Sequence, residues 1–440
     1  MKKYNVAIVG ATGAVGAELL KGLDERDFPI DELRLLASER SQGKKIVWRD
    51  KEYEVSETNI NSFKDMDIAL FAGGSASTAF ADEAVKAGCV VIDNSSAFRY
   101  NPEVPLIIPE VNPEDALWHK GIIANPNCST IQMVVALKPL HDAGSLTRVV
   151  VSTYQAVSGA GLDGIKELRE QTTRISRQES YNYLKENARD TADKIADSEL
   201  AESIKSQAAK VAQSSVADNI REQMGKIAAS KSVRELREQL TKLTQSEIAK
   251  DIKDGLEKFG KSEVVGEMKD NLSHLAKTDE IKPSCFHYQI AFNLLPQIDI
   301  FLENGYTKEE MKMVWETQKM LHLPELPIAA TCVRVPVFRS HSEAVNIETN
   351  RKLSADEARQ LLAAAQGIIV IDNPAENEYP MPAMIADTDA VYVGRIREDI
   401  SCKNGLVFWV VADQLRKGAA TNAIQIAELL VAKDLVKIPQ

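Results

Sequence analysis

The sequence predicts an α/β protein with an N-terminal, Rossmann-like doubly wound sheet, a second α+β domain and an inserted all-helical segment. Three observations carry this prediction. A glycine-rich loop follows the first apolar run, strands with few helices dominate from Arg148 onward, and one long stretch has no proline and a helical apolar period. We place the first domain at residues 1–130 plus 416–440, the second at 131–173 plus 283–415, and the helical segment at 174–282.

The first apolar run, Tyr4 to Val9, ends at the loop Gly10-Ala-Thr-Gly-Ala-Val-Gly16, and a helical pattern follows. A strand, a glycine loop and a helix in this order are the context of a dinucleotide-binding fingerprint, because the helix N-terminus binds the pyrophosphate. The spacing is G-x-x-G-x-x-G, and Thr12 stands where the common form has its second glycine. We expect a nucleotide cofactor to bind at Gly10, Gly13 and Gly16.

The second predicted strand, residues 33–37, ends in Ser38-Glu39-Arg40-Ser41. A carboxylate at this place binds the ribose of NAD, whereas arginine and hydroxyl groups bind the 2′-phosphate of NADP. Glu39 keeps NAD possible, but Arg40 between Ser38 and Ser41 favours NADP. The next strands, 68–71 and 90–92, are also followed by small polar residues, as in a parallel sheet that binds ligands at its carboxyl edge.

Cys128 lies between an apolar run, residues 121–124, and the apolar helical pattern that begins near Ile131. This order predicts a strand, a sharp turn and a helix, with Cys128 at or just before the first helical turn. Unpaired amides and the helix dipole favour a thiolate there. The alternative is a small cysteine buried in the core at the end of a strand.

From Arg148 the predicted strands alternate with few helices, which indicates a mixed or antiparallel sheet in the second domain. The C-terminal run 416–432 is strongly helical and is expected to pack back on the first domain. The predicted strands of the second domain are 149–155, 289–293, 329–337, 344–349, 391–396 and 406–412.

The segment 174–282 fits neither pattern. Its apolar residues recur in sets on one helical face, and the sets repeat about every 16 residues, so a single straight helix would lose its apolar stripe. Serine and threonine, which are helix-capping residues, lie at the joints. We expect about six short helices that pack on one another. A mobile, partly helical insertion is the alternative.

Several polar residues stand where chemistry is possible. Arg99, in a loop after a strand, is either a solvated charge or a phosphate contact. Glu309 and Lys312 share one face of a helix that begins near Thr307, and an exposed ion pair is the plain interpretation. Arg334 lies inside an apolar strand and must face water, a carboxylate or a ligand. His341, in a loop, is the best candidate base among six histidines.

The totals exclude some classes of protein. The formal net charge of −11 argues against a nucleic-acid or anionic-membrane partner. Five widely spaced cysteines without a C-x-x-C pair argue against a disulfide framework or a zinc site, and we expect no metal. No apolar run approaches the roughly 20 residues that a membrane helix needs. We expect a cytoplasmic protein.

Four motifs occur in order, and with them the chain closely resembles aspartate-semialdehyde dehydrogenases of the bacterial type. The resemblance covers essentially everything outside 174–282, where the family normally has a much shorter connection, so we expect an insertion of about 100 residues. The motifs are Gly10-Ala-Thr-Gly-Ala-Val-Gly16, Asn125-Pro-Asn-Cys-Ser-Thr-Ile-Gln132, Ser152-Thr-Tyr-Gln-Ala-Val-Ser-Gly-Ala-Gly161 and Arg334-Val-Pro-Val-Phe-Arg-Ser-His-Ser-Glu343.

The resemblance implies roles for single residues. Cys128 forms a thioester, Gln155 orients the substrate and His341 moves the proton. For the substrate, Arg334 binds the carboxylate and Glu309 the amino group, Arg99 and Lys312 bind the phosphate, and Asn127 belongs to the same pocket. The implied NADP contacts are Thr12, Gly13, Ala14, Val15, Arg40, Ser41, Ser158, Gly159 and Asn422.

The implied reaction is the reversible conversion of L-aspartyl 4-phosphate and NADPH to L-aspartate 4-semialdehyde, NADP and phosphate, on the route to lysine, methionine and threonine. The first domain would bind NADP, and the second would be a catalytic and dimerisation domain in a homodimer or homotetramer. Two alternatives stay open: an N-acetyl-γ-glutamyl-phosphate reductase, which performs the same thioester chemistry on a longer acid, and a scaffold whose helical segment binds a protein partner.

Overall fold

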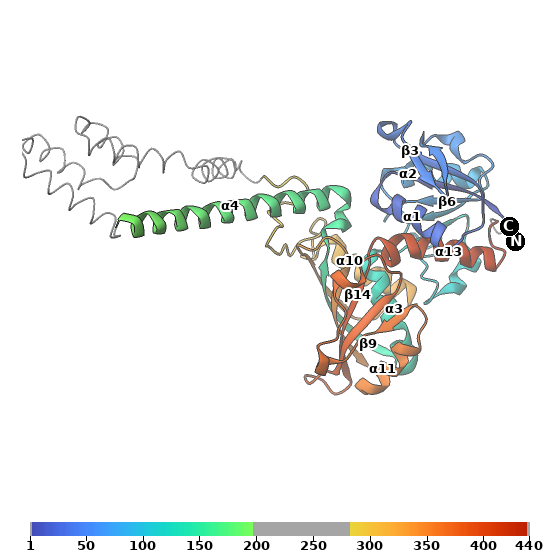
Figure 1. The fold of residues 1–440 in the computed structure, drawn as a ribbon. Helices are drawn as coiled ribbons and strands as arrows, with labels where there is room; N and C mark the ends of the chain where they lie inside the picture. Colours follow the sequence, from blue (N-terminus) through green and yellow to red (C-terminus); the bar gives the residue numbers. More distant parts are fainter. Residues whose placement is uncertain (1, 197–281, 438–440) are drawn as a thin grey trace, which may run out of the picture. The chain divides into compact units, whose positions relative to one another are not determined.

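The computed structural model describes residues 2–196 and 282–437 (Figure 1). The chain divides into two compact units, Met1–Arg169 with Pro283–Gln440, and Glu170–Lys282. The first unit holds both predicted sheets. All five cysteines are free thiols. Within the described ranges, no helix is both long enough and apolar enough to cross a membrane.

The first sheet is parallel throughout and has the order β5-β2-β1-β6-β7-β8. The chain moves outward from β1 to β2 and then returns to add β6 on the other side, so the order reverses between β1 and β6. Doubly wound sheets bind ligands at this switch point, beyond the carboxyl ends of the strands. The strands are β1 (Tyr4–Val9), β2 (Ile30–Ala37), β5 (Ser56–Glu57), β6 (Ile68–Phe71), β7 (Val90–Asp93) and β8 (Ile122–Ala124).

Helices cover this sheet because its central strands are apolar on both faces. α1 (Ala14–Glu25) packs against the C-terminal helix α13 (Thr421–Ala432), and the buried residues of both join one core cluster with β1 and β2. α2 (Ser75–Lys86) contacts β6 and β7. The prediction that the C-terminal helix packs on the first domain is confirmed, and Figure 1 shows α13 beside α1.

The second sheet is mixed, with the order β10-β9-β11-β14-β13-β12. β9 and β10 are parallel, β9, β11, β14 and β13 are antiparallel in turn, and β12 joins β13 in parallel. The predicted mixed sheet is therefore confirmed. The strands are β9 (Leu146–Gln155), β10 (Ile328–Arg334), β11 (His341–Thr349), β12 (Ile368–Val370), β13 (Val391–Glu398) and β14 (Gly405–Ala412).

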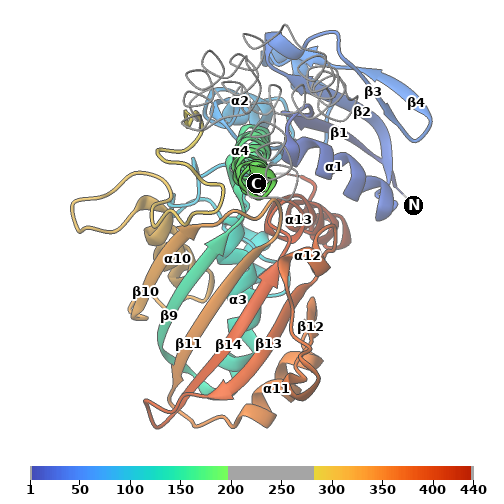
Figure 2. The same cartoon turned by 60° about the vertical axis from the view of Figure 1, so that its left-hand side comes forward.

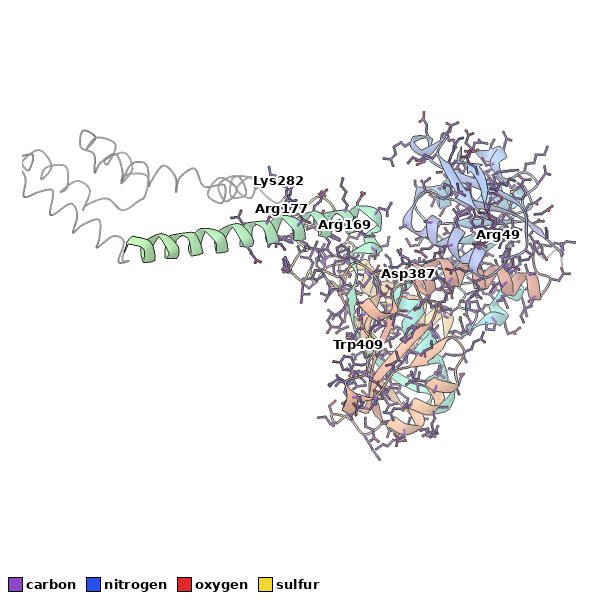
Figure 3. The ribbon with its side chains drawn as sticks, in the orientation of Figure 1. Arg49, Arg169, Arg177, Lys282, Asp387 and Trp409 are labelled. Carbon is purple, nitrogen blue, oxygen red and sulfur yellow. The ribbon has the colours of Figure 1, made fainter. Side chains whose placement is uncertain are left out.

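One face of this sheet is buried and the other is open. Alternate residues such as Val151, Val345 and Val410 are buried on the face that the helices cover. α3 (Cys128–Gly144) packs against β9, β11 and β14, and α11 (Ala355–Ala364) packs against β12 and β13. Figure 2 shows α3 behind the sheet. On the opposite face the rings of Tyr154 and Trp409 lie 5.4 Å apart, and Tyr154 is exposed. Figure 3 labels Trp409 on this sheet.

Some elements differ from the prediction. Residues 289–293 are not a strand, because Phe292 has a positive φ of 58° and the Asn293 side chain donates to the carbonyl of Gln289. The sequence reading also missed the hairpin of β3 (Lys45–Trp48) and β4 (Lys51–Glu54), as well as α11 and β12. Charged residues on short exposed strands hide the period of two on which strand prediction depends.

The remaining helices include α10 (Lys308–Met320), whose N-cap is Thr307 as predicted. Thr307 accepts from the Glu310 amide, and the Glu310 carboxylate accepts from the Thr307 amide, which forms a capping box. Shorter helical turns are α12 (Pro382–Ile385), a π-helical turn η6 (Arg416–Ala420) and the 3₁₀ turns η1 (Glu39–Ser41), η2 (Ile60–Phe63), η3 (Pro113–Trp118), η4 (Val157–Ala160) and η5 (Pro374–Glu376).

The helix α4 (Gly161–Ala196) enters the segment that we expected to form an insertion. It continues without a break through residue 174, where we placed the start of that segment. Most of the predicted array of six helices lies in residues 197–281, outside the described residues. The array therefore stays a prediction.

Candidate active site

The nucleophile candidate lies where the sequence predicted it. Cys128 is the first residue of α3, four residues after β8 ends at Ala124. Asn127 caps the helix, because its Oδ1 accepts from the amides of Ser129 at 3.1 Å and Thr130 at 3.3 Å. The predicted strand, turn and helix are confirmed, and Cys128 is only partly buried, unlike a core cysteine.

The expected thiolate is not supported by the structure. Burial and the nearby Glu309 carboxylate raise the pKa of Cys128 to about 12, although Arg99, Arg334 and the Ser129 amide act in the opposite direction. Burial is the main cause, and the cap adds to it. Two of the helix amides that were expected to stabilise a thiolate already donate to Asn127. The raised pKa favours the neutral thiol at neutral pH.

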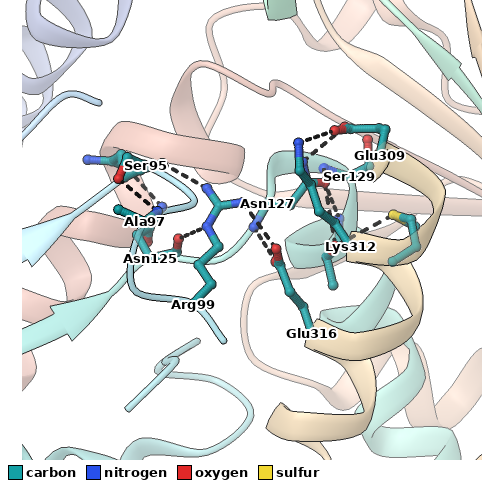
Figure 4. A network of polar contacts seen from close by, with 12 residues as sticks. Ser95, Ala97, Arg99, Asn125, Asn127, Ser129, Glu309, Lys312 and Glu316 are labelled. Atoms are coloured by element: carbon teal, nitrogen blue, oxygen red, sulfur yellow. Dashed lines mark hydrogen bonds and ion pairs between the residues drawn. The ribbon is translucent and has the colours of Figure 1, made fainter. Parts of the chain in front are cut away.

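Glu309 joins three predicted residues into one network, shown in part in Figure 4. Its Oε1 accepts from Asn127 Nδ2 at 2.9 Å and Gln155 Nε2 at 3.1 Å, and its Oε2 accepts from Lys312 Nζ at 2.9 Å. Burial opposes the charge of Glu309, but Lys312 and these hydrogen bonds lower its pKa to about 2. The Glu309–Lys312 pair is therefore a buried ion pair that faces the nucleophile turn.

Arg99 is buried and donates to three acceptors. Its Nε donates to the Asn125 carbonyl at 2.9 Å, its Nη2 to the Asn94 carbonyl at 2.7 Å, and its Nη1 to Glu316 Oε1 at 3.1 Å (Figure 4). A guanidinium has five N–H groups, so two are not used by these bonds. Arg99 also lines a cavity that Cys128 lines, so its two remaining N–H groups could bind an anion in that cavity.

Glu316 is a site residue that the sequence reading missed. It is fully buried on α10, and its Oε2 accepts from the Asn127 amide at 2.6 Å while its Oε1 binds Arg99. Glu309, Lys312 and Glu316 are spaced by three and then four residues, so one helix face carries all three. The shared face could be read from the spacing, but a charged helix face is normally exposed, so the spacing did not show that this one is buried.

Arg334 ends β10 with its guanidinium buried. Its Nη1 donates to the Ala156 carbonyl at 2.7 Å, and no carboxylate of the described residues lies at ion-pair distance from it. Burial lowers the pKa of Arg334, while Glu309 opposes that shift. A buried cation without a carboxylate partner is costly for folding, so this arrangement favours an anionic ligand.

His341, at the start of β11, is fully buried. Its Nδ1 accepts from the Ala156 amide at 3.0 Å, and its Nε2 has no hydrogen-bond partner among the described residues. Burial, and then Arg334, lower the pKa of His341 to about 3. A neutral ring whose Nδ1 accepts a hydrogen bond carries its proton on Nε2. The geometry thus favours a donor, whereas the sequence led us to expect a base.

One cavity of about 800 Å³ connects the nucleophile to the glycine loop. That volume is in the range of ligand and cofactor sites. Its lining comes from the carboxyl edge of the first sheet, from the nucleophile turn and from the segments after β9 and β14. The predicted residues in its wall are Gly10, Thr12, Gly13, Ala14, Val15, Ser38, Arg99, Asn127, Cys128, Ser158 and Gly159.

The glycine loop fits a pyrophosphate cradle. Gly10 has a φ of +87°, which other residues rarely adopt, and a side chain on Gly16 would overlap the Gly10 carbonyl. Gly16 therefore serves close packing and does not line the cavity. Thr12 Oγ1 donates to Ser41 Oγ at 3.2 Å, which ties the loop to the turn after β2.

The turn after β2 gives a mixed picture for cofactor choice. Ser38 and Glu39 line the cavity, whereas Arg40 is exposed and Ser41 is buried, and neither of these two lines the cavity. Of these two charged residues, Glu39 lines the cavity and Arg40 does not. The residues present fit a nicotinamide dinucleotide of either type.

Asn422, an expected NADP contact, does not line the cavity, whereas Gln414, which the sequence analysis did not name, does. Asn422 is buried outside the cavity lining, where its Nδ2 donates to the Ile107 carbonyl at 3.0 Å and to Asn125 Oδ1 at 2.7 Å. Gln414 lines the cavity beside Ser158, to whose hydroxyl it is hydrogen-bonded. The sequence analysis missed Gln414, which lies outside the four motifs. The π-helical turn η6 separates Gln414 from Asn422 and shifts the helix register between them.

Gly418 in this π-helical turn provides a direct test of the site geometry. A Cβ at residue 418 would lie 2.8 Å from Cys128 Cβ, so Gly418→Ala must displace the nucleophile. We expect the kcat of the activity proposed below to fall roughly 10- to 100-fold, because misplacement by about 1 Å costs that much. Gly22→Ala is the matched control, since its Cβ would meet only the flexible end of Ile424. Equal kcat values in both variants would contradict the assigned contact.

Comparisons with known proteins agree with these features. Residues 5–119 match the family described as semialdehyde dehydrogenase, NAD binding domain, and residues 137–254 and 228–417 match its dimerisation domain. The aspartate-semialdehyde dehydrogenase of Aquifex aeolicus is 46% identical over 437 residues, and that of Bacillus subtilis is 42% identical over 434 residues. Each alignment covers 98% of this chain and 99% of the relative.

A solved structure is similar as well. The crystal structure of aspartate semialdehyde dehydrogenase II from Vibrio cholerae, complexed with ASA, has a TM-score of 0.72 and 39% identity, and the match covers 98% of this chain and 99% of that one. Because the matches run over nearly the whole of both chains, they do not confirm that residues 174–282 are additional to the family. They also give no support to a protein partner for that segment.

Proposed function

Because the chain belongs to the aspartate-semialdehyde dehydrogenase family, we propose that it interconverts L-aspartyl 4-phosphate and L-aspartate 4-semialdehyde through a thioester on Cys128. The observation that carries the proposal is that Cys128 and the Gly10–Val15 loop line one cavity. A thiol beside a dinucleotide site is what oxidation of an aldehyde to an acyl thioester requires. A bound nicotinamide cofactor would supply or accept the hydride.

The acyl-transfer step balances without a separate base. The Cys128 sulfur attacks the acyl carbon, the bond from carbon to phosphate oxygen breaks, and the thiol proton leaves on the departing phosphate. Arg99 has two N–H groups left for that phosphate, and Lys312, which already binds Asp299 and Glu309, has one. The raised pKa of Cys128 and the lowered pKa of His341 favour the neutral form of both groups, which supports this route.

The substrate would be held by the charges around the nucleophile. Among the described residues Arg334 has no carboxylate at ion-pair distance, and we assign it the α-carboxylate. Glu309 stays ionised and is assigned the amino group, and it also fixes Asn127 and Gln155. His341 would donate its Nε2 proton to the oxygen of the tetrahedral adduct, where preorganised donors act most strongly.

The proposed neutral thiol predicts a pH dependence. With a pKa near 12, the thiolate fraction of Cys128 grows tenfold per pH unit. The rate of alkylation of Cys128 by iodoacetamide should therefore rise about tenfold for each pH unit between about pH 7 and 10. The rate is measured on the Cys128 peptide by mass spectrometry, with Cys128→Ala as the blank. A rate that levels off below about pH 8.5, the value for a free cysteine, would contradict the assigned burial.

The direct test of the function is a substrate comparison. We expect the purified protein to oxidise aspartate semialdehyde only when phosphate and a nicotinamide cofactor are both present. N-acetylglutamate semialdehyde should be a far poorer substrate, and the reverse preference would favour the reductase alternative.

We further propose that NADP is the cofactor, because Arg40 follows β2 between two serines. Parallel assays with NAD test this, and Glu39 in the cavity wall is the reason to include them.

We also propose a homodimer that forms through the open face of the second sheet. Tyr154 and Trp409 lie on that face, and the match to a dimerisation domain supports the assignment. Sedimentation should give twice the chain mass.

The free cysteines and the family match support a reducing, cytoplasmic setting.

A further inference from the structure

The segment that returns to the first unit, residues 284–286, is anchored by a buried carboxylate. Glu167 on α4 is 5% exposed, and its Oε2 accepts from the Ser284 amide at 2.9 Å and the Ser284 hydroxyl at 2.8 Å. The same oxygen accepts from the Cys285 amide. Three donors on one oxygen fix the backbone of this segment, although Ser284 and Cys285 are themselves exposed.

The anchored segment reaches the predicted carboxylate-binding arginine. The ring centroid of Phe286 lies 5.9 Å from Arg334 Cζ, within the range of a cation–π contact. The η4 turn also restricts the position of this guanidinium. The carbonyl of Ala156 accepts from Arg334 Nη1 at 2.7 Å, and a Cβ on Gly159 would lie 2.8 Å from that nitrogen. The guanidinium is therefore confined by backbone on one side and contacted by an aromatic ring.

We propose that Phe286, held by Glu167, is a specificity-determining residue that closes the carboxylate end of the substrate site. The inference rests on the proposed function. The reacting carbon must lie at Cys128 and the α-carboxylate at Arg334, so these two residues set the length of the substrate. An acid with one more methylene would push its carboxylate past the arginine, toward the segment that carries Phe286. A pocket wall commonly discriminates roughly 10- to 200-fold per methylene.

The test compares Phe286→Ala with Tyr288→Ala in the full-length protein. Tyr288 lies two residues further along the same segment and is 69% exposed, so it is the matched control. Kinetics are measured with aspartate semialdehyde and with N-acetylglutamate semialdehyde at saturating phosphate and NADP. For Phe286→Ala we expect the KM for the shorter substrate to rise about tenfold with kcat little changed, and the preference over the longer substrate to fall about tenfold. Tyr288→Ala should leave both values unchanged.

Two further variants keep the result decisive. Phe286→Leu retains apolar bulk without the ring, so it should preserve the length preference while the KM rises, and it decides the matter if the alanine variant does not fold. Glu167→Gln should lower the preference in the same direction, because a neutral amide oxygen holds three donors less firmly. Unchanged KM and preference in the Phe286 variants would overturn the inference. A wild-type protein inactive on both semialdehydes would instead refute the proposed function.

Discussion

Replacement of Cys128 by alanine should remove the activity almost completely. We expect kcat for phosphate-dependent oxidation of aspartate semialdehyde to fall by about four orders of magnitude or more, as happens when a covalent nucleophile is lost. Cofactor affinity should stay within about twofold, because the Gly10–Val15 loop is built by β1 and α1 and not by α3. Steady-state assays and a fluorescence titration of NADPH measure the two quantities.

Cys332→Ala serves as the control for the loss of a thiol. Cys332 is a buried cysteine of β10, and its amide donates to Glu310 Oε1 at 3.0 Å. Its replacement should cost stability and leave kcat largely intact. Residual turnover in Cys128→Ala that equals that of Cys332→Ala would remove the nucleophile assignment.

Arg334→Met should separate function from stability. The change removes a buried cation that has no carboxylate partner among the described residues. We expect kcat/KM for aspartate semialdehyde to fall about 1,000-fold, since the proposed bidentate pair of charged hydrogen bonds to the substrate is lost. The free energy of unfolding should change by no more than about 1 kcal/mol, because relief from burying a guanidinium offsets the lost bond to Ala156. Kinetics and urea unfolding measure both effects.

The control for this variant is Arg148→Met. Arg148 lies on β9 in the same sheet, but it forms an exposed ion pair with Glu348 at 2.9 Å. Such pairs contribute little, so neither activity nor stability should change measurably. If Arg334→Met kept its activity, or unfolded as readily as a variant with a core cavity, Arg334 would be a structural residue and the substrate carboxylate would need another partner.

The local parts of the site could be predicted from the sequence because short-range order determines them. The glycine loop between β1 and α1, the turn before Cys128 and the Thr307 cap each depend on fewer than about ten consecutive residues. Arg334 was predictable for a different reason. A charge inside an apolar strand has few acceptable environments, so its presence alone indicates a ligand or a partner.

The contacts that were missed arise between segments far apart in the chain. Glu316 meets Asn127 across 189 residues, and Gln414 meets Ser158 across 256. Phe286 contacts Arg334 from a segment whose neighbouring residue Ser284 is hydrogen-bonded to Glu167. The thiolate prediction failed for a related reason. The helix dipole could be read from the sequence, but the occupancy of its amides by Asn127 and the burial near Glu309 could not.

These observations reduce to one claim, that the substrate becomes covalently attached to Cys128 during turnover. The protein is mixed with aspartate semialdehyde and NADP without phosphate. After rapid digestion, the mass of the Cys128 peptide is measured by mass spectrometry. We predict one equivalent of NADPH per site, a mass gain of one aspartyl group on that peptide, and loss of the group when phosphate is added. Continuous NADPH formation without phosphate, or an aspartyl group on any other residue, would contradict it.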